Sequence, residues 1–520
     1  MKKIKNKYIL SVLTGTLLFL AYPFTGSITP FIFIALAPLL YVEDQLKNVQ
    51  KSFFKVLKFS WISFLIYNIG STWWIWNASE GGAIFAIVLN AFLMALFFSF
   101  YHYLSKKSNS KYSIFFLIPI WISFEYFHYQ WELSWPWLNF GNVFSLQIKW
   151  IQWFEYTGVL GGTLWVLLIN ILLFKIISAE LRLKRAVVYL TIFLIIPFTI
   201  SFYKYYTFNE VGEEKEIVLL QPNIDPYTEK FSSDIYSQMN KMYLIADSII
   251  TPQTDLIVAP ETAISQPFWE NNFQQTSLYN SINSKVNNWR IPFLTGASTL
   301  RFFKSKKSSV SRLLSDGSGY YESYNTSVLF EMDKSPKYIH KSKLVLGVEK
   351  IPFNTIFPWL ENLALNFGGS SGSLGIEDST KIFSLKNMKM AATVCYESVY
   401  GGFVAAQVEK GAEFISIITN DGWWGDTPGY KQHASFARLR AIENRRCIVR
   451  SANTGQSCIV NQKGDILHQT PYWEEAGFNA KIKINNKLTF YSSFGDYLGW
   501  LGVFSFVLII LKFVLDSMKK

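Results

Sequence analysis

The chain of 520 residues is 50% hydrophobic, 18% aromatic and only 17% charged, which is more apolar than an ordinary soluble enzyme. Its length allows more than one structural unit. The formal net charge of +12 does not indicate a nucleic-acid-binding protein, because much of the basic excess lies in short clusters between apolar runs and no nucleic-acid-binding motif is present. The three cysteines show no metal-ligand spacing, and their odd number leaves at least one thiol unpaired within the chain.

Long apolar segments fill the chain up to residue 205. A helix that crosses a bilayer takes about 20 mostly apolar residues. We predict seven such helices and an eighth near the C-terminus, over residues 8–23, 28–43, 56–76, 83–104, 112–130, 157–178, 186–205 and 496–516. The first resembles a signal peptide, but it lacks a small-residue cleavage pattern and further apolar segments follow at once. We therefore expect it to be retained as a membrane helix.

Basic residues between these segments predict their orientation. Lysine and arginine precede the first helix, recur after the second, fourth and sixth, and follow the eighth. The alternate loops contain almost none, since residues 77–82 have no basic residue and residues 131–156 have only Lys149. Under the positive-inside rule, both termini lie in the cytoplasm and residues 206–495 lie outside.

Tryptophans gather where helix ends should meet the outer face of the membrane. They are Trp73, Trp74, Trp76, Trp131, Trp135, Trp137, Trp150 and Trp153. One interpretation is a belt of aromatic side chains at the membrane interface. The other is that residues 131–156, a segment too long for a simple turn, line an entry path for lipid.

Between residues 209 and 490 the pattern changes to short β-rich runs separated by helical stretches. Strands are predicted over residues 216–223, 255–260, 292–299, 326–331, 382–385, 391–395, 413–419, 447–451 and 457–461, and helices over 232–250 and 429–445. This alternation indicates an α/β layered domain, and the glycine- and serine-rich residues 367–375 should form a flexible loop. We therefore divide the chain into a membrane domain with seven transmembrane helices, an extracytoplasmic α/β domain, and a closing helix with a short tail: residues 1–208, 209–492 and 493–520.

Three segments of the second domain contain residues suited to covalent catalysis. Glu261 ends an apolar strand, where a carboxylate can act as a general base, although most such glutamates are solvated loop residues. Lys341 has the charge to stabilise a thiolate and an oxyanion, although most lysines are surface charges. Cys395 also ends an apolar strand, where most cysteines are inert core residues. A base and a cation from the other two segments would make it a nucleophile.

The order and surroundings of these residues resemble the nitrilase superfamily, whose Glu–Lys–Cys triad lies on three strand-end segments of an α–β–β–α sandwich. The resemblance continues through residues 418–426, 432–443 and 450–455. Seven helices, an external nitrilase-like domain and a closing helix are similar to the layout of the apolipoprotein N-acyltransferase family. The runs at Gln221 and at Asn325 resemble the same family.

The resemblance implies catalytic roles for Glu261, Lys341 and Cys395. It adds supporting roles for Asn325, Glu349, Tyr396, Glu397 and Trp423. The two glutamates would orient the lysine, hold the base, or be structural acids, the tyrosine would shape an acyl pocket, and the tryptophan would either meet lipid in a flexible outer loop or pack. The sequence departs from the family pattern at Lys343 and Phe231, where a histidine and a tryptophan are expected.

The resemblance implies an acyltransferase that moves the sn-1 acyl chain of a phospholipid, through a thioacyl-cysteine, to the α-amine of the N-terminal diacylglyceryl-cysteine of apolipoproteins. The phospholipid donor, the diacylated apolipoprotein and the lipid bilayer would be its partners, at the inner membrane with the catalytic domain on the periplasmic side. No cofactor or metal is required, and we expect a monomer that binds no nucleic acid. One alternative is a membrane-tethered nitrilase-type amidase that uses water as acceptor. Another is a transporter, which predicts charged residues inside the spans, with Glu125 and Lys175 as candidates.

Overall fold

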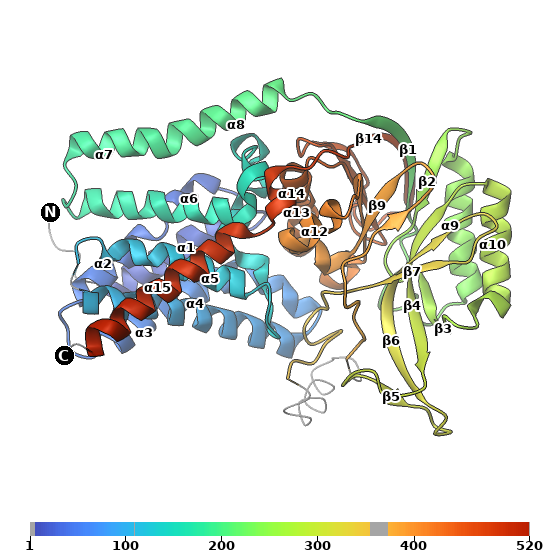
Figure 1. Ribbon diagram of the computed structural model, residues 1–520, viewed down its shortest axis with the longest axis horizontal. Coiled ribbons are helices and arrows are strands. Elements are labelled where there is room, and N and C mark those ends of the chain that lie inside the picture. Colours follow the sequence, from blue (N-terminus) through green and yellow to red (C-terminus); the bar gives the residue numbers. More distant parts are fainter. Residues whose placement is uncertain (1–5, 109, 354–372, 519–520) are drawn as a thin grey trace. The chain divides into compact units, whose positions relative to one another are not determined.

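The computed structural model describes residues 6–108, 110–353 and 373–518, and it contains two compact units (Figure 1). The helical unit comprises residues 1–76, 80–208 and 494–520, and the α/β unit comprises residues 77–79 and 209–493. The chain therefore leaves the helical unit after residue 208 and returns to it at residue 494.

Each segment that the sequence predicts to cross the membrane contains an α-helix, but residues 28–43 are interrupted by a turn between the 3-10 helix η1 (Thr29–Phe33) and α2 (Ala37–Leu46). The helices of this unit are α1 (Lys7–Ala21), α2 (Ala37–Leu46), α3 (Ser52–Thr72), α4 (Glu80–Ser108), α5 (Leu117–Phe127), α6 (Phe154–Ile177), α7 (Leu183–Leu190), α8 (Ile196–Thr207) and α15 (Tyr497–Met518). A π-helical turn, η7 (Thr191–Ile195), joins α7 to α8. Within the described ranges, five helical segments are long and apolar enough to cross a membrane: Thr29–Leu46, Glu80–Ser108, Phe154–Ile177, Lys184–Thr207 and Tyr497–Met518.

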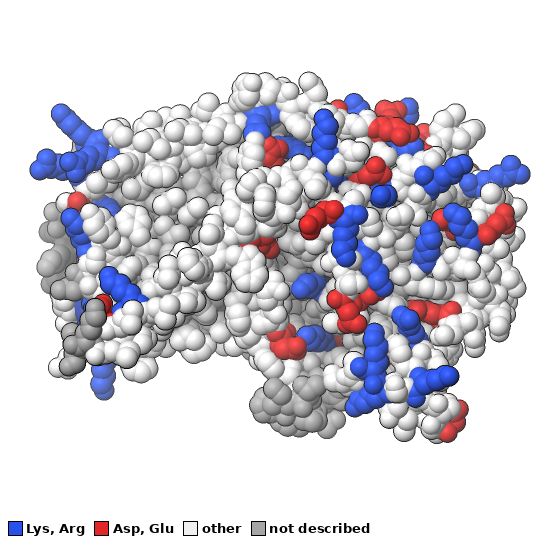
Figure 2. Space-filling model, in the orientation of Figure 1, with Lys and Arg blue, Asp and Glu red and all other residues white. Residues whose placement is uncertain are grey.

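Charge is distributed unevenly over the helical unit. Figure 2 shows a face whose middle is almost free of charged side chains, while lysine and arginine gather at the end of the unit where α7 begins and α15 ends. An apolar band next to a basic end is the pattern expected of a helical membrane domain.

The tryptophans of the predicted outer interface differ in burial, and Trp131, Trp135, Trp150 and Trp153 are half-buried. Trp73 and Trp76 are 45% and 47% exposed, whereas Trp74 and Trp137 are buried with their ring centroids 5.1 Å apart. The long loop around Trp137 consists of three short 3-10 turns, η4 (Pro136–Leu138), η5 (Phe140–Leu146) and η6 (Ile148–Trp150). The exposed pair fits an interfacial belt, while the buried pair packs the loop into the helical unit, which neither interpretation of the sequence predicted.

Glu125 on α5 is a buried carboxylate inside the helical unit. It accepts hydrogen bonds from the Thr163 hydroxyl on α6 (2.6 Å) and from the backbone N–H of Phe140 in the long loop (2.9 Å). Such donors compensate the cost of burying a carboxylate, and they join two helices to the loop. Lys175, near the end of α6, pairs with Glu180 at 3.3 Å. Both candidates of the transporter interpretation therefore have structural partners.

Two β-sheets form the centre of the α/β unit. The first has the order β14–β1–β2–β4–β6–β5, with β3 beside β4 and β7 beside β6, and the second has the order β13–β12–β11–β10–β9–β8. The strands are β1 (Glu213–Gln221), β2 (Thr254–Val258), β3 (Ile264–Trp269), β4 (Phe293–Phe303), β5 (Arg312–Leu313), β6 (Tyr320–Phe330), β7 (Lys337–His340), β8 (Phe383–Ser384), β9 (Lys389–Val394), β10 (Phe414–Thr419), β11 (Ile448–Ala452), β12 (Cys458–Val460), β13 (Ile466–Gln469) and β14 (Ala476–Ile484). The helices are α9 (Ile235–Ile249), α10 (Ser277–Trp289), α12 (Gly401–Glu409), α13 (Pro428–Asn444) and α14 (Phe490–Phe494).

Alternating apolar side chains on the strands produce the layers. On β1, Ile217 and Leu219 lie in a core shared with second-sheet residues such as Met390, whereas Val218 and Leu220 lie in the core that includes residues of α9 and α10. Successive side chains of a strand point to opposite faces, so one sheet can join two cores. A third core contains residues of the second sheet, α12 and α13. The unit is an α–β–β–α sandwich, as the sequence predicted (Figure 1).

The elements found include five strands that the sequence did not predict, namely β3, β5, β7, β13 and β14. The predicted strands correspond to β1, β2, β4, β6 and β8–β12, and the predicted helices to α9 and α13. The sequence did not predict β14, which pairs antiparallel with β1 along its whole length. Residues 478–484 alternate apolar and polar side chains, so the local signal of this strand was present and the prediction overlooked it. Most of the predicted loop 367–375 lies outside the described residues, which resume at residue 373.

Candidate active site

The three predicted catalytic residues all lie where a strand ends. Glu261 comes three residues after β2, Lys341 directly follows β7, and Cys395 directly follows β9 as the first residue of the short 3-10 helix η9 (Cys395–Val399). All three side chains are buried. The Nζ atom of Lys341 lies 3.1 Å from Oε1 of Glu261, and both charges act on the pKa of the Cys395 thiol. The fold therefore brings together three residues that are far apart in sequence.

The Glu261 carboxylate is surrounded by donors. Oε1 accepts from the Asn325 amide on β6 (2.7 Å) as well as from Lys341, and Oε2 accepts from the backbone N–H of Asn420 (3.0 Å). Burial would raise the pKa of Glu261, but Lys341, Lys230 and the Asn325 hydrogen bond outweigh it and hold the pKa below its ordinary value. The group is therefore ionised at neutral pH and able to accept a proton.

Lys341 lies between two carboxylates. Its Nζ donates to Glu349 Oε1 at 2.9 Å and to Glu261. Glu349 also accepts from Asn325 Nδ2 (2.8 Å) and from the backbone N–H of Val345 (2.8 Å). Burial would lower the pKa of Lys341, but the two glutamates raise it well above its ordinary value. The structure therefore places the predicted supporting residues in direct contact with the predicted triad, Asn325 with Glu261 and Glu349 with Lys341.

Cys395 has an unusual backbone and a protonated thiol. Its φ of +51° is left-handed, which costs a non-glycine residue on the order of 1–3 kcal/mol. Burial raises the pKa of the thiol strongly and the nearby charge of Glu261 raises it further, while Lys341 lowers it. At neutral pH the side chain is therefore a thiol, which needs a base before it can act as a nucleophile.

Glu397 connects the cysteine turn to the lysine segment. Its carboxylate accepts from the backbone N–H groups of Val394 (2.7 Å), Ser342 (2.6 Å) and Lys343 (3.3 Å). Burial raises its pKa to about 7, against the effect of these hydrogen bonds. The predicted supporting residue Glu397 thus holds the main chain next to Lys341 rather than the lysine side chain itself.

The aromatic candidates differ in exposure. Tyr396 is buried and packs edge-on against Tyr400, with ring centroids 5.3 Å apart. Trp423, in the 3-10 helix η10 (Asp421–Trp424), is half-buried and makes an edge contact with Tyr227 at 5.2 Å. Phe231, at the position where a tryptophan was expected, is 65% exposed. Trp423 therefore packs within the α/β unit, and Phe231 presents a large apolar side chain to the surroundings.

Lys230 is a functional candidate that sequence reasoning missed. Its side chain is buried, and Nζ donates to the backbone oxygen of Glu261 (3.1 Å). When the Asn420 amide is turned so that its oxygen faces Lys230, this oxygen lies 3.0 Å from the same Nζ and accepts a hydrogen bond from it. Burial lowers the pKa of Lys230 to about 8, although the charge of Glu261 opposes this shift. Only its position next to Phe231 marked the segment, because a buried lysine and a surface lysine look alike in a sequence.

Asp421, His433 and Arg450 form a buried cluster next to the main chain of Cys395. Asp421 accepts from Arg450 and contacts His433 Nδ1 at 3.0 Å, while His433 Nε2 lies 3.1 Å from the Cys395 carbonyl oxygen. Cys395, Asp421 and His433 have donor atoms within 4.8 Å of one another, so they are the described residues closest to a metal-binding group. The guanidinium of Arg450 on Asp421 opposes a second cation there, so we assign no metal to the cluster.

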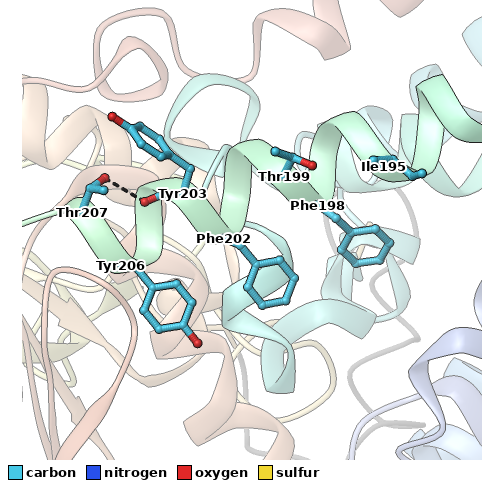
Figure 3. Close-up of a pocket in the computed structure, with 7 residues that line it drawn as sticks. All are labelled: Ile195, Phe198, Thr199, Phe202, Tyr203, Tyr206 and Thr207. Carbon is cyan, nitrogen blue, oxygen red and sulfur yellow. Dashed lines mark hydrogen bonds between the residues drawn. The ribbon is translucent and has the colours of Figure 1, made fainter.

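A groove on the helical unit is separate from this chemistry. It has a volume of about 500 Å³ and is lined by side chains of a single stretch of helix, as Figure 3 shows: Ile195, Phe198, Thr199, Phe202, Tyr203, Tyr206 and Thr207. None of these residues is a carboxylate, a thiol or a cation. The groove is an aromatic and aliphatic surface of α8, and it contributes no catalytic group.

The sandwich, with a buried glutamate, lysine and cysteine at its strand ends, defines an enzyme of the nitrilase type. The Carbon-nitrogen hydrolase family matches residues 219–486, and the Apolipoprotein N-acyltransferase N-terminal domain matches residues 14–172. The chain therefore belongs to the carbon-nitrogen hydrolase family, and within it to the apolipoprotein N-acyltransferases. Its apolar helices agree with a membrane-bound member of that group.

Relatives that match the chain along nearly its whole length carry the same name. An apolipoprotein N-acyltransferase of Chlorobaculum tepidum is 29% identical over 528 residues, covering 98% of each chain. One of Geobacter metallireducens is 27% identical and covers 95% of this chain and 93% of its own. Among solved structures, a Saccharomyces cerevisiae member of branch 10 of the nitrilase superfamily is 16% identical and covers 52% of this chain and 90% of its own, with a TM-score of 0.36. The family membership rests on the sequence matches and not on this structure.

Proposed function

We propose that this protein transfers an acyl chain from a membrane phospholipid to the α-amine of the N-terminal lipid-modified cysteine of an apolipoprotein. Cys395 is the covalent carrier. One observation carries the proposal: the Glu261–Lys341 pair acts on a buried thiol in a chain whose helical unit matches the N-terminal domain of the apolipoprotein N-acyltransferases.

The first half-reaction acylates the cysteine. Glu261 takes the thiol proton of Cys395, and the sulfur attacks the carbonyl carbon of the sn-1 ester. The C–O bond then breaks, and Glu261 returns the proton to the departing alkoxide, so a lysophospholipid leaves and a thioester remains. The lowered pKa of Glu261 keeps the base ionised, and the raised pKa of the thiol is the reason a base is needed.

Lys341 stabilises the oxyanion that forms on the attacked carbonyl. An ammonium group has three N–H donors. Two are directed at Glu261 and Glu349, which leaves the third for the oxyanion. The two glutamates thus orient the cation while their charges keep it protonated.

The second half-reaction moves the acyl group to an amine. The neutral α-amine attacks the thioester carbon, Glu261 accepts one amine proton, and the C–S bond breaks. Glu261 then returns the proton to the sulfur, which restores the thiol of Cys395 and releases the amide. The reaction is ping-pong, because one product leaves before the second substrate reacts.

We place the α/β unit on the outer side of the inner membrane and both chain termini in the cytoplasm. The basic residues in alternate loops support this orientation, as does their concentration at one end of the helical unit (Figure 2). Both substrates carry acyl chains anchored in a bilayer, so an enzyme that joins them must work at the lipid surface.

The proposal predicts a covalent adduct on one cysteine. Purified full-length protein incubated with phosphatidylethanolamine should gain one acyl mass that hydroxylamine removes, and Cys395→Ala should gain none. Cys458→Ala is the matched control, because Cys458 is also a buried thiol but lies on β12 outside the site. Intact-mass spectrometry of the three proteins measures the result.

The molecule that accepts the acyl group from the adduct distinguishes a transferase from a hydrolase. Addition of a diacylated lipopeptide should discharge the wild-type adduct and produce an N-acylated peptide. Discharge by water alone would favour an amidase-type hydrolase, and the absence of any adduct on folded wild-type protein would contradict the assignment of Cys395.

A further inference from the structure

The left-handed backbone of Cys395 is held by contacts on its own carbonyl group. The carbonyl oxygen accepts a hydrogen bond from the Ser398 hydroxyl at 2.7 Å, and His433 Nε2 lies 3.1 Å from the same oxygen and 3.0 Å from Ser398 Oγ. A carbonyl oxygen can only accept, so this contact is favourable when Nε2 carries a hydrogen. Two donors on one carbonyl offset the strain of the turn at the residue that must present its sulfur to Glu261 and Lys341.

His433 is itself held from the opposite side of its ring. Its Nδ1 lies 3.0 Å from Asp421 Oδ1 and 3.2 Å from Arg450 Nη2, so it donates to the carboxylate when it carries a hydrogen and accepts from the guanidinium when it does not. The same carboxylate also accepts from the Thr419 hydroxyl (2.8 Å) and from Arg450. Burial opposes ionisation of Asp421, but Arg450 and His433 hold its pKa far below the usual range. The group is therefore a fixed anion that orients the imidazole.

The side chains involved come from four elements in or beside the second sheet. His433 belongs to α13, Thr419 ends β10, Arg450 lies on β11, and Asp421 opens η10. Each of these four side chains is fully buried, and Trp424 lies edge-on to His433 at a centroid distance of 5.7 Å. The imidazole therefore has one orientation, with Nε2 directed at the cysteine turn.

We propose that His433 is a positioning residue that holds the Cys395 carbonyl, and through it keeps the sulfur where the base and the cation act on it. The inference rests on the proposed function only for the role of Cys395 as the nucleophile. Asp421 and Arg450 serve the same end by orienting the imidazole.

Substituting His433 by glutamine or by asparagine distinguishes the positioning role from a purely structural one. In a glutamine at position 433, the amide nitrogen reaches about as far as Nε2, so His433→Gln keeps a donor for the Cys395 carbonyl and loses the contact with Asp421. In an asparagine, the amide reaches only about as far as Nδ1, so His433→Asn keeps the contact with Asp421 and loses the carbonyl. A structural role in balancing Asp421 favours asparagine, whereas the positioning role favours glutamine.

The readout is the alkylation rate of Cys395 by iodoacetamide, located by peptide mass spectrometry, on full-length protein. We expect His433→Asn to slow alkylation about tenfold or more, since the turn loses a contact that offsets its strain, and His433→Gln to stay within about threefold of wild type. The single-turnover rate of acyl-adduct formation should follow the same order, with the half-saturating phospholipid concentration unchanged. His468→Gln and His468→Asn are matched controls, because His468 lies exposed on β13, and neither should change the rate.

Equal slowing by both amides, or wild-type rates in both, would overturn the proposal. If neither His433 variant folds, Ser398→Ala decides, because it removes the other donor to the same oxygen. Slower alkylation at an unchanged melting temperature supports the positioning role, and an unchanged rate overturns it. Alkylation does not need lipid, so the two proposals can fail separately. If the variants are alkylated in the expected order but wild-type protein forms no acyl adduct, the proposed function is rejected and this inference stands.

Discussion

Glu261→Gln is expected to slow acyl-adduct formation on Cys395 by about 10²–10⁴-fold, the usual contribution of a general base. The thiol is protonated at neutral pH because burial and the charge of Glu261 raise its pKa, so it does not attack an ester unaided. Glutamine has the size of glutamate and can accept from Lys341 or Asn325, but it cannot take a proton. Single-turnover adduct formation, followed by intact mass, measures the loss.

Glu331→Gln is the matched control for this substitution. Glu331 is also a buried glutamate just after a strand, and it pairs with Lys334 at 3.0 Å and Lys337 at 3.1 Å, but it lies outside the site. We expect it to leave the adduct rate within about twofold of wild type, as substitutions away from the chemistry do. A comparable loss in both variants would mean that stability and not base catalysis limits the reaction.

The pH profile tests which carboxylate is the base. The folded pKa of Glu261 lies below its ordinary value of about 4.3, so the wild-type rate should hold down to about pH 5. The stabilisation from this ionised group is present above the ordinary pKa and is lost as the pH falls through the lowered one. An acid limb near pH 7 would instead point to Glu397, whose pKa burial raises to about 7.

The sequence offers the triad as a hypothesis because three segments occur in a specific order, even though each alone is common. Glu261 and Cys395 follow apolar strands that the sequence predicts, whereas Lys341 follows β7, which the sequence did not predict. The fold class followed from the alternation of strands and helices. These signals are local, and local patterns are what a single sequence displays.

The rest of the site depends on tertiary contacts that leave no such pattern. Nothing near Lys230 indicates that its ammonium group turns inward to the backbone of Glu261. His433 and Arg450 lie in a helix and a strand that the sequence did predict, but their contact through Asp421 arises only when β10, β11 and α13 pack together. A buried ion cluster of this kind looks like ordinary surface charge until the fold is known.

Lys230→Met is expected to raise thermal stability near neutral pH while it lowers the rate of acyl-adduct formation. The pKa of Lys230 is about 8 in the folded protein, against an ordinary value of 10.5, because burial penalises the ammonium form. The folded state is therefore less stable by about 3 kcal/mol below pH 8 than it would be with an unshifted lysine. Methionine has a similar length and no charge, so it removes this penalty together with the cation beside Glu261.

The sign of the pH dependence makes the prediction specific. Between pH 8 and 10.5 the unfolded chain binds the proton that the folded protein has lost, so wild-type stability rises relative to the methionine variant, and the advantage of the variant disappears. Melting temperatures of both full-length proteins from pH 7 to 11 measure this convergence. Lys241→Met is the matched control, since Lys241 forms a partly exposed pair with Glu475 at 3.2 Å and should show no such trend. A variant that melts lower than wild type at every pH would mean that the hydrogen bonds of Lys230 to Glu261 and Asn420 outweigh its burial, and that this lysine is retained for stability and not for catalysis.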